Sequence, residues 1–244
     1  EIDKTHAAAR LLSAEIAEYL GRRDEAIEAY QWFDRQLVER QDLPRDAEWL
    51  TVVGKGFYRF SLLSRTDLSR RTKHALVELF QTAYQRVDRS YWPARVAAAD
   101  LLRSKYNNDE TDGAVGDYLA ALKINPQLPE AFVGIGEAAL ENWQFEEVER
   151  RAKQALEVNS VFPPAYHLLA RCRIQERRYD DAIALADKAL ETNASDLTAL
   201  SLQAAALASK LDSAALAATL SRVERINPRC AELYRTLGDA MSAL

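Results

Sequence analysis

Residues 124–159 read INPQLPEAFVGIGEAALENWQFEEVERRAKQALEVN, and the chain repeats this pattern at a fixed step as far as Pro228. An asparagine recurs every 34 residues, at Asn125, Asn159, Asn193 and Asn227. Three further columns keep this register. They are Ala121, Ala155, Ala189 and Val223; Ala131, Ala165, Ala199 and Leu233; and the bulky Phe132, Tyr166, Leu200 and Tyr234. Self-similarity at this period, with only helix-compatible patterning inside it, is typical of a solenoid of helix–turn–helix units.

The unit resembles a tetratricopeptide (TPR) repeat, whose pattern W-x2-L-G-x2-Y, then A-x3-F, then P spans about 34 residues. The matches to its first part are Phe132-Ile135-Gly136, Tyr234-Leu237-Gly238 and, more loosely, Tyr166-Leu169-Ala170. Segments 20–30 and 178–183 read like the turn and second helix of the family. No Trp occupies the first column of any repeat. The resemblance implies an all-α, right-handed solenoid of helical hairpins, with about six helix pairs and a terminal helix.

The predicted organisation has three parts. Residues 1–45 form an N-terminal TPR-like hairpin, and residues 46–92 form a divergent, longer hairpin with helices at about 47–64 and 68–90. Residues 93–244 form a regular array, which consists of the hairpins 93–126, 127–160, 161–194 and 195–228 and a terminal helix, 229–244. Within this array, helices are expected at about 94–107, 112–124, 129–141, 145–158, 163–176, 179–192, 196–209 and 212–225.

Specific residues are expected to begin and end these helices. Gly21 can adopt the positive φ that ends the first helix. Asn159 and Asn193 are expected to enter the left-handed conformation in the same role, and Ser195 to cap the following helix. Phe132, Tyr166 and Tyr234 of the bulky column are expected to fill the space between neighbouring hairpins.

Composition supports helix and gives few clues to partners. The 244 residues are 48% hydrophobic, no run alternates in the manner of a strand, and no apolar run approaches the roughly 20 residues that cross a bilayer. Acidic and basic residues are interspersed with a net charge of −5, which argues against a nucleic-acid partner. Cys172 and Cys230 are expected to be unpaired thiols.

The compartment and the length of the natural product stay open. The chain begins at Glu1 rather than Met, so we expect a trimmed or processed chain; a cytoplasmic location is favoured, and a removed signal peptide stays an alternative. The terminal helix carries a weak polar cap, so we expect the natural protein to continue past Leu244. The oligomeric state does not follow from the sequence.

Motifs that could carry chemistry have a simpler explanation here. Residues 134–139 fit the loose dinucleotide fingerprint, but they lie in a predicted helix with no preceding strand. The run Gly54-Lys55-Gly56 is expected to pack near Phe57 rather than bind phosphate. The three histidines, His6, His74 and His167, have no metal-ligand partner at helical spacing. The carboxylate pairs 146–147 and 180–181 fall at helix starts, where they complement the helix dipole. No cofactor, metal or catalytic residue is predicted, and the chain is expected not to be an enzyme.

Function is therefore sought on a surface. In TPR proteins the first helix of each pair lines an inner groove that commonly receives a peptide, and the resemblance implies the same concave face here. The predicted partner-binding residues are Arg103, Tyr106, Asn107, Glu137, Glu141, His167, Arg171 and Gln175. Further residues on the matching face include Ser201, Ala205, Arg235 and Asp239. The family's Lys and Asn clamp for C-terminal carboxylates is missing, because Ala99, Val133 and His167 stand where a clamp lysine would.

The sequence thus predicts a non-catalytic scaffold that binds a peptide or protein segment through its concave TPR groove. Two alternatives stay open. The chain could be the accessory TPR region of a larger enzyme, since some bacterial proteins with similar repeats place them next to a peptidase-like domain, which here would follow residue 244. It could also bind RNA, as other helical-hairpin arrays do, which would require a basic groove and salt-sensitive capture.

Overall fold

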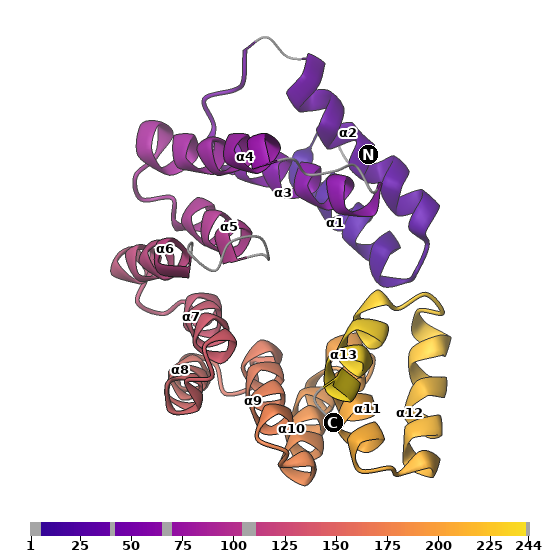
Figure 1. The fold of residues 1–244 in the computed structure, drawn as a ribbon. Helices are drawn as coiled ribbons and strands as arrows, with labels where there is room; N and C mark the ends of the chain where they lie inside the picture. The colour runs from indigo at the N-terminus through magenta and orange to yellow at the C-terminus, as the bar shows by residue number, and fades with distance from the viewer. Residues whose placement is uncertain (1–5, 40–41, 65–69, 104–110, 243–244) are drawn as a thin grey trace. The chain divides into compact units, whose positions relative to one another are not determined.

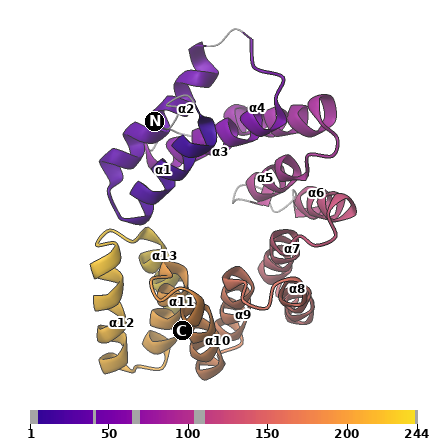
Figure 2. The same ribbon diagram turned by 180° about the vertical axis from the view of Figure 1, so that it is seen from behind.

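The structure, a computed structural model, describes residues 6–39, 42–64, 70–103 and 111–242. In these residues the chain forms thirteen α-helices and one short π-helical segment, and no strand, which confirms the predicted all-α fold (Figures 1 and 2). The helices divide into two compact units, Glu1–Pro126 and Gln127–Leu244.

The first unit is a succession of packed helices. They are α1 (Ala7–Tyr19), α2 (Arg23–Glu39), α3 (Ala47–Leu63), α4 (Arg70–Thr82), the π-helical segment η1 (Ala83–Val87), α5 (Trp92–Arg103) and α6 (Thr111–Ile124). Helices that follow one another pack together, and α3 also contacts both α1 and α5. The helix predicted at 68–90 is therefore α4 followed by the wider turn of η1, which ends where the Asp88 N–H donates to the Ala83 carbonyl at 2.9 Å.

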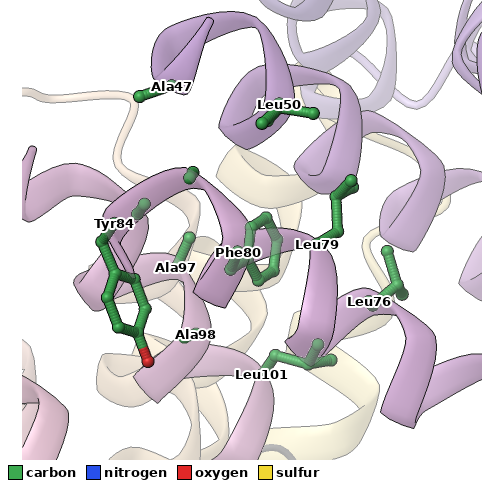
Figure 3. Close-up of a cluster of buried hydrophobic side chains, with 11 residues drawn as sticks. Ala47, Leu50, Leu76, Leu79, Phe80, Tyr84, Ala97, Ala98 and Leu101 are labelled. Atoms are coloured by element: carbon green, nitrogen blue, oxygen red, sulfur yellow. The ribbon is translucent and has the colours of Figure 1, made fainter. Parts of the chain in front are cut away.

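The core of the first unit is built from large side chains at the joint between its hairpins. Figure 3 shows Phe80 of α4 at the centre of this cluster, between Leu50 of α3 and Leu101 of α5, with Tyr84 of η1 to one side. All four side chains are buried. Each such side chain contributes roughly 1.5–3 kcal/mol when it leaves water, so this cluster is a main source of stability for α3 to α5.

The run Gly54-Lys55-Gly56 lies inside α3, and both glycines are packing residues, as predicted. Their neighbours differ from the expected Phe57. A Cβ on Gly54 would lie 2.5 Å from Phe80 Cε1, and a Cβ on Gly56 would lie 2.3 Å from Phe33 Cγ. Because neither contact leaves room for a methyl group, glycine at these positions lets α3 approach the aromatic rings of α2 and α4.

The second unit contains the regular hairpins. Its helices are α7 (Pro129–Glu141), α8 (Phe145–Val158), α9 (Pro163–Gln175), α10 (Tyr179–Thr192), α11 (Leu197–Ser209), α12 (Ser213–Ile226) and α13 (Ala231–Ser242). Their bounds agree with the predicted ranges to within two residues. The first helices of the hairpins also contact each other, α7 with α9 and α9 with α11. The carboxylate pairs 146–147 and 180–181 lie in the first turns of α8 and α10, as predicted.

Four helices that open a hairpin, α1, α7, α9 and α11, are each followed by a turn with a left-handed residue. Gly21 has φ 72°, as expected, but the matching residues of the second unit are Trp143, Arg177 and Leu211, with φ between 58° and 62°. The next N–H in each turn donates five residues back, for example from Gln144 to the Ala139 carbonyl at 3.0 Å. This is the Schellman arrangement, which satisfies carbonyls at a helix C-terminus.

The asparagine column works differently from the prediction. Asn159, Asn193 and Asn227 are extended, with φ near −142°, rather than left-handed. Their side-chain oxygens instead accept the N–H two residues on, at 3.1, 3.0 and 2.8 Å. This Asx turn redirects the chain after the second helix of each hairpin. Asp196, not Ser195, caps α11, because its Oδ1 accepts the Ala199 N–H at 2.9 Å.

The bulky column is not uniformly buried. Leu200 is fully buried, and Phe132 is half-buried against the core shared by α7, α8 and α9. Tyr234 is 68% exposed, so the expectation that it fills the space between hairpins is wrong. Tyr166 is half-buried, and its hydroxyl donates to the Ser160 carbonyl at 2.8 Å.

Candidate functional site

The predicted binding residues of the second unit lie on α7 and α9. They are Glu137, Glu141, His167, Arg171 and Gln175, which we call the first-helix face. Residues four apart share one side of a helix, so each helix aligns its members, and the contact between α7 and α9 brings the two rows together. Glu141 and Gln175 are exposed, whereas the other three are half-buried.

Arg171 is the centre of the first-helix face. Its guanidinium lies 3.0 Å from Glu137 of α7 and 3.4 Å from Glu232 of α13. Glu232 in turn pairs with Arg235 at 2.7 Å. The side chains of Glu137, Arg171 and Glu232 are 18%, 28% and 29% exposed, so water and a partner can reach them. The charges thus alternate in a row that joins three helices.

His167 forms a second polar contact on this face. Its Nε2 lies 2.9 Å from Asp196 Oδ2, and both side chains are largely buried. Burial alone would raise the pKa of Asp196. The hydrogen bond and charge of His167 and the backbone N–H of Ala199 outweigh it, so this pKa lies below its ordinary value of 3.8. Asp196 therefore caps α11 and fixes its start to α9 at the same time.

The predicted face does not continue onto α11. Ser201 and Ala205, which were expected to line the groove, are fully buried, and Ser201 donates to the Leu197 carbonyl at 2.7 Å. Helix α13 packs mainly on α11 rather than on α12, and it does so through its buried residues Leu233, Thr236 and Ala240. Small side chains along α11 permit this close approach. Arg235 and Asp239 of α13 are exposed.

The remaining predicted residues lie near the end of α5 in the first unit. Arg103 is half-buried beside Tyr118, whose hydroxyl hydrogen-bonds Asp100. Burial first, and then the neighbouring Asp100 carboxylate, hold the pKa of Tyr118 well above its usual range, while Arg103 opposes the shift. Arg103 thus takes part in a local polar cluster within α5 and α6. Tyr106 and Asn107 lie outside the described residues.

Comparisons with known proteins agree with this architecture. A tetratricopeptide-repeat family model matches residues 163–196. A thermophilic TPR protein from Thermus thermophilus has a similar structure: 22% identity over 83% of this chain and 99% of that chain, TM-score 0.62. A tetratricopeptide repeat protein from Parabacteroides merdae follows, with 17% identity over 97% and 86% of the two chains, TM-score 0.59. Residues 163–196 therefore match a tetratricopeptide repeat, and the described helices have the fold of TPR proteins.

Two further comparisons concern one more solved structure and the curated proteins. Pseudomonas aeruginosa pilF shares the fold at 14% identity over 96% of this chain and 97% of that one, with a TM-score of 0.53. No curated protein matches the sequence of this chain.

Other kinds of site were sought in the described part of the chain. No group of three or more His, Cys, Asp or Glu residues there could hold a metal ion. None of its helices is long and apolar enough to span a bilayer. Cys172 and Cys230 are free and buried, as expected, and burial raises the pKa of the Cys172 thiol to about 11. Such a thiol stays protonated at neutral pH and is a poor nucleophile.

Sequence reasoning placed Glu137, His167 and Arg171 on one face of the TPR array but missed their partners. Asp196 precedes the first apolar residue of α11, which is a typical capping position and could have been recognised. Glu232 has no such signal, since its contact with Arg171 depends on how α13 packs against α11.

Proposed function

We propose that this chain is a non-catalytic scaffold that binds a peptide or protein segment through its first-helix face. The observation that supports the proposal is the accessible row Glu137–Arg171–Glu232, in which Arg171 stands between two carboxylates from different helices. The side chains of the row keep 18–29% exposure, so water screens these ion pairs and limits their contribution to folding. The same groups are accessible enough to exchange one charged partner for another.

The row specifies the chemistry of the partner. A carboxylate of the bound segment replaces Glu232 at Arg171, and a nearby Lys or Arg of the segment reaches Glu141, which is exposed at the end of α7. The segment therefore carries acidic and basic residues close together. Such complementarity gives specificity more than affinity. The described residues do not add support to either alternative. These are RNA binding and a role as the accessory region of a larger enzyme.

The test is selection of peptides from a displayed random library on the 244-residue chain, followed by titration of the winning peptides. Arg171→Gln is expected to weaken binding about tenfold or more, because the segment's carboxylate loses its charged partner. Glu232→Gln is expected to strengthen binding, because it removes the competing carboxylate. These opposite signs distinguish use of the row from general damage to the fold.

Arg150→Gln is the matched control. Arg150 lies on α8, is exposed and also pairs with a glutamate, Glu147. Its loss should leave peptide binding unchanged. Selected peptides that bind Arg171→Gln as tightly as the wild type would place the binding surface elsewhere on the array.

A further inference from the structure

Helix α13 does not take the position that the repeat assigns to it. Each earlier first helix of the second unit packs on the second helix before it, α9 on α8 and α11 on α10. Helix α13 instead lies along α11, two helices back, and has little contact with α12 (Figures 1 and 2). The departure from the repeat therefore concerns a surface that α13 covers, rather than one that it leaves open.

The surface that α13 covers is the continuation of the first-helix face onto α11. Ala205 stands 34 residues after Arg171, and Ser201 stands 34 residues after His167. The two residues of α9 are half-buried, whereas Ser201 and Ala205 are fully buried. All of residues 199–207 are buried, so α11 has a neighbour on every side, and α13 is the neighbour that lies outside the regular repeat.

The contact of α13 with α11 has the pattern of a helix bound in a groove. The residues of α13 that are buried or half-buried against α11 and its core lie at i, i+3, i+4 and i+7; they are Leu233, Thr236, Leu237 and Ala240. Helical segments that bind in grooves use these same four positions as anchors. Glu232, just before the first anchor, adds the ion pair with Arg171 of α9. Helix α13 thus contacts two first helices at once, as a bound segment would.

Helix α13 is held by fewer neighbours than the other first helices. Helix α9 packs against α7, α8, α10 and α11, whereas α13 packs chiefly against α11. Two of the four anchors, Thr236 and Ala240, are small and bury little apolar surface. Gly238 weakens the helix relative to alanine, and an isolated helix of 12 residues is marginal in water. Release of α13 therefore disturbs less of the fold than release of any helix between two hairpins.

We propose that α13 is an internal ligand of the first-helix face, and that the partner is an amphipathic helix that displaces it. This inference rests on the proposed function and specifies the class of its partner. The partner helix carries large apolar residues at i and i+4, small residues at i+3 and i+7, and an acidic residue just before i. Glu232 and Arg235 of α13, which pair with each other, already supply the neighbouring acidic and basic residues expected of the partner.

Competition with α13 also sets the affinity. A partner binds α11 only in chains from which α13 has been released, so its apparent affinity falls with the fraction of such chains. Weakening the contact between α13 and α11 is therefore expected to strengthen the binding of any helix that uses the same surface.

The test uses the α13 sequence itself as the probe. A fluorescent peptide of Ala231–Ser242, stapled between the exposed positions 234 and 238 to hold it helical, is titrated into the 244-residue chain and its variants. Leu233→Asp places a charge at a buried anchor and is expected to release α13. Fluorescence anisotropy should show this variant binding the peptide at least about tenfold more tightly than the wild type, in which α13 is docked.

Tyr234→Asp is the matched control. It places the same charge on the same helix, at a residue that is largely exposed, so it should bind the peptide no better than the wild type does. Arg171→Gln, added to Leu233→Asp, should weaken peptide binding again, because the acidic residue of the peptide loses its charged partner. If circular dichroism shows that Leu233→Asp damages the whole array, Ala240→Arg replaces it, since Ala240 is the buried anchor at the other end of the contact.

Hydrogen exchange shows whether α13 has been released. Its amides should lose protection in Leu233→Asp, while those of α7 to α11 keep theirs. A variant with released α13 that binds the peptide no better than the wild type overturns the proposal. Library-selected peptides that depend on Arg171 but do not compete with the α13 peptide also overturn it, and they leave the proposed function standing. Failure of the proposed function has a different signature, namely selected peptides that bind regardless of Arg171.

Discussion

Helices pack closely both in the hairpin of α3 and α4 and in the hairpins of the second unit, but different residues permit the close contact. In the second unit, fully buried alanines such as Ala152, Ala155 and Ala189 recur at fixed columns, so small residues at the same places pack successive hairpins. In the first unit, Gly54 and Gly56 each face an individual aromatic ring. The regular hairpins therefore share a common interface, whereas the divergent hairpin depends on pairs matched one by one.

The turns of the two regions also differ. The first hairpin closes its first helix with Gly21, which adopts positive φ without strain. The regular hairpins place Trp143, Arg177 and Leu211 in the same conformation, which costs a residue with a side chain roughly 1–2 kcal/mol. Regularity of the repeat therefore does not mean that each position holds its best residue.

The largest expected effect tests whether equivalent residues of the bulky column contribute equally to the free energy of unfolding. Leu200→Ala should lower the free energy of unfolding by about 2–5 kcal/mol, because Leu200 is fully buried in the core of α11 and α12. Tyr234→Ala, in the same column, should change it by less than about 0.5 kcal/mol, because Tyr234 is largely exposed. Urea unfolding followed by circular dichroism measures both. Equal losses would mean that α13 is covered in solution.

The next effect tests the matched pairs of the first unit. Gly56→Ala should cost about 1–3 kcal/mol, because its new methyl group would overlap the buried ring of Phe33. Gly116→Ala is the control within the same unit, since a Cβ there meets nothing within 4 Å. It should stabilise α6 by about 0.5–1 kcal/mol, the usual advantage of alanine over glycine in a helix. A harmless Gly56→Ala would show that α3 and α2 can move apart freely.

The difference between the regular and the divergent hairpins also explains which structural features could be predicted from the sequence. The 34-residue spacing predicted every helix of the second unit, because each of its turns uses a local backbone motif that the spacing preserves. It did not predict how the asparagines act, since an Asx turn and a left-handed cap use the same residue type. In the first unit, the glycines of α3 were recognised as packing residues, but their partners Phe80 and Phe33 could not be chosen without the helix arrangement.

The candidate site also has a part that the sequence predicted and a part that it did not. Helical periodicity placed Glu137, His167 and Arg171 on one face, because that follows from spacing within each helix and the repeat between them. The contacts of this face with Asp196 and Glu232 join residues 29 and 61 positions apart. They depend on how α11 and α13 pack, which no single column of the repeat determines.

A smaller effect is expected at the turns. Gly21→Ala should cost about 1 kcal/mol, because alanine would be held at positive φ. Leu211→Gly should gain roughly 0–1 kcal/mol, because relief of the same strain exceeds the greater unfolded-state entropy of glycine. Leu211 is 85% exposed, so little buried contact is lost with its side chain. If Leu211→Gly destabilises the protein, the leucine makes contacts in solution that offset its strained backbone.

The smallest effect concerns the response of the regular array to acid. The folded-state pKa of Asp196 lies below its ordinary value of 3.8, so its contribution to stability is fully present well above that pH. The contribution is lost as the pH falls from about 5 through the folded-state pKa, because the unfolded chain takes up the proton more readily. Asp196→Asn keeps an oxygen that can cap α11 but removes the charge beside His167. Urea unfolding at pH 7, 5, 4 and 3 should therefore show the wild type's advantage over this variant shrinking toward low pH. An advantage that stays constant across this range would mean that the bond between His167 and Asp196 does not depend on the carboxylate charge.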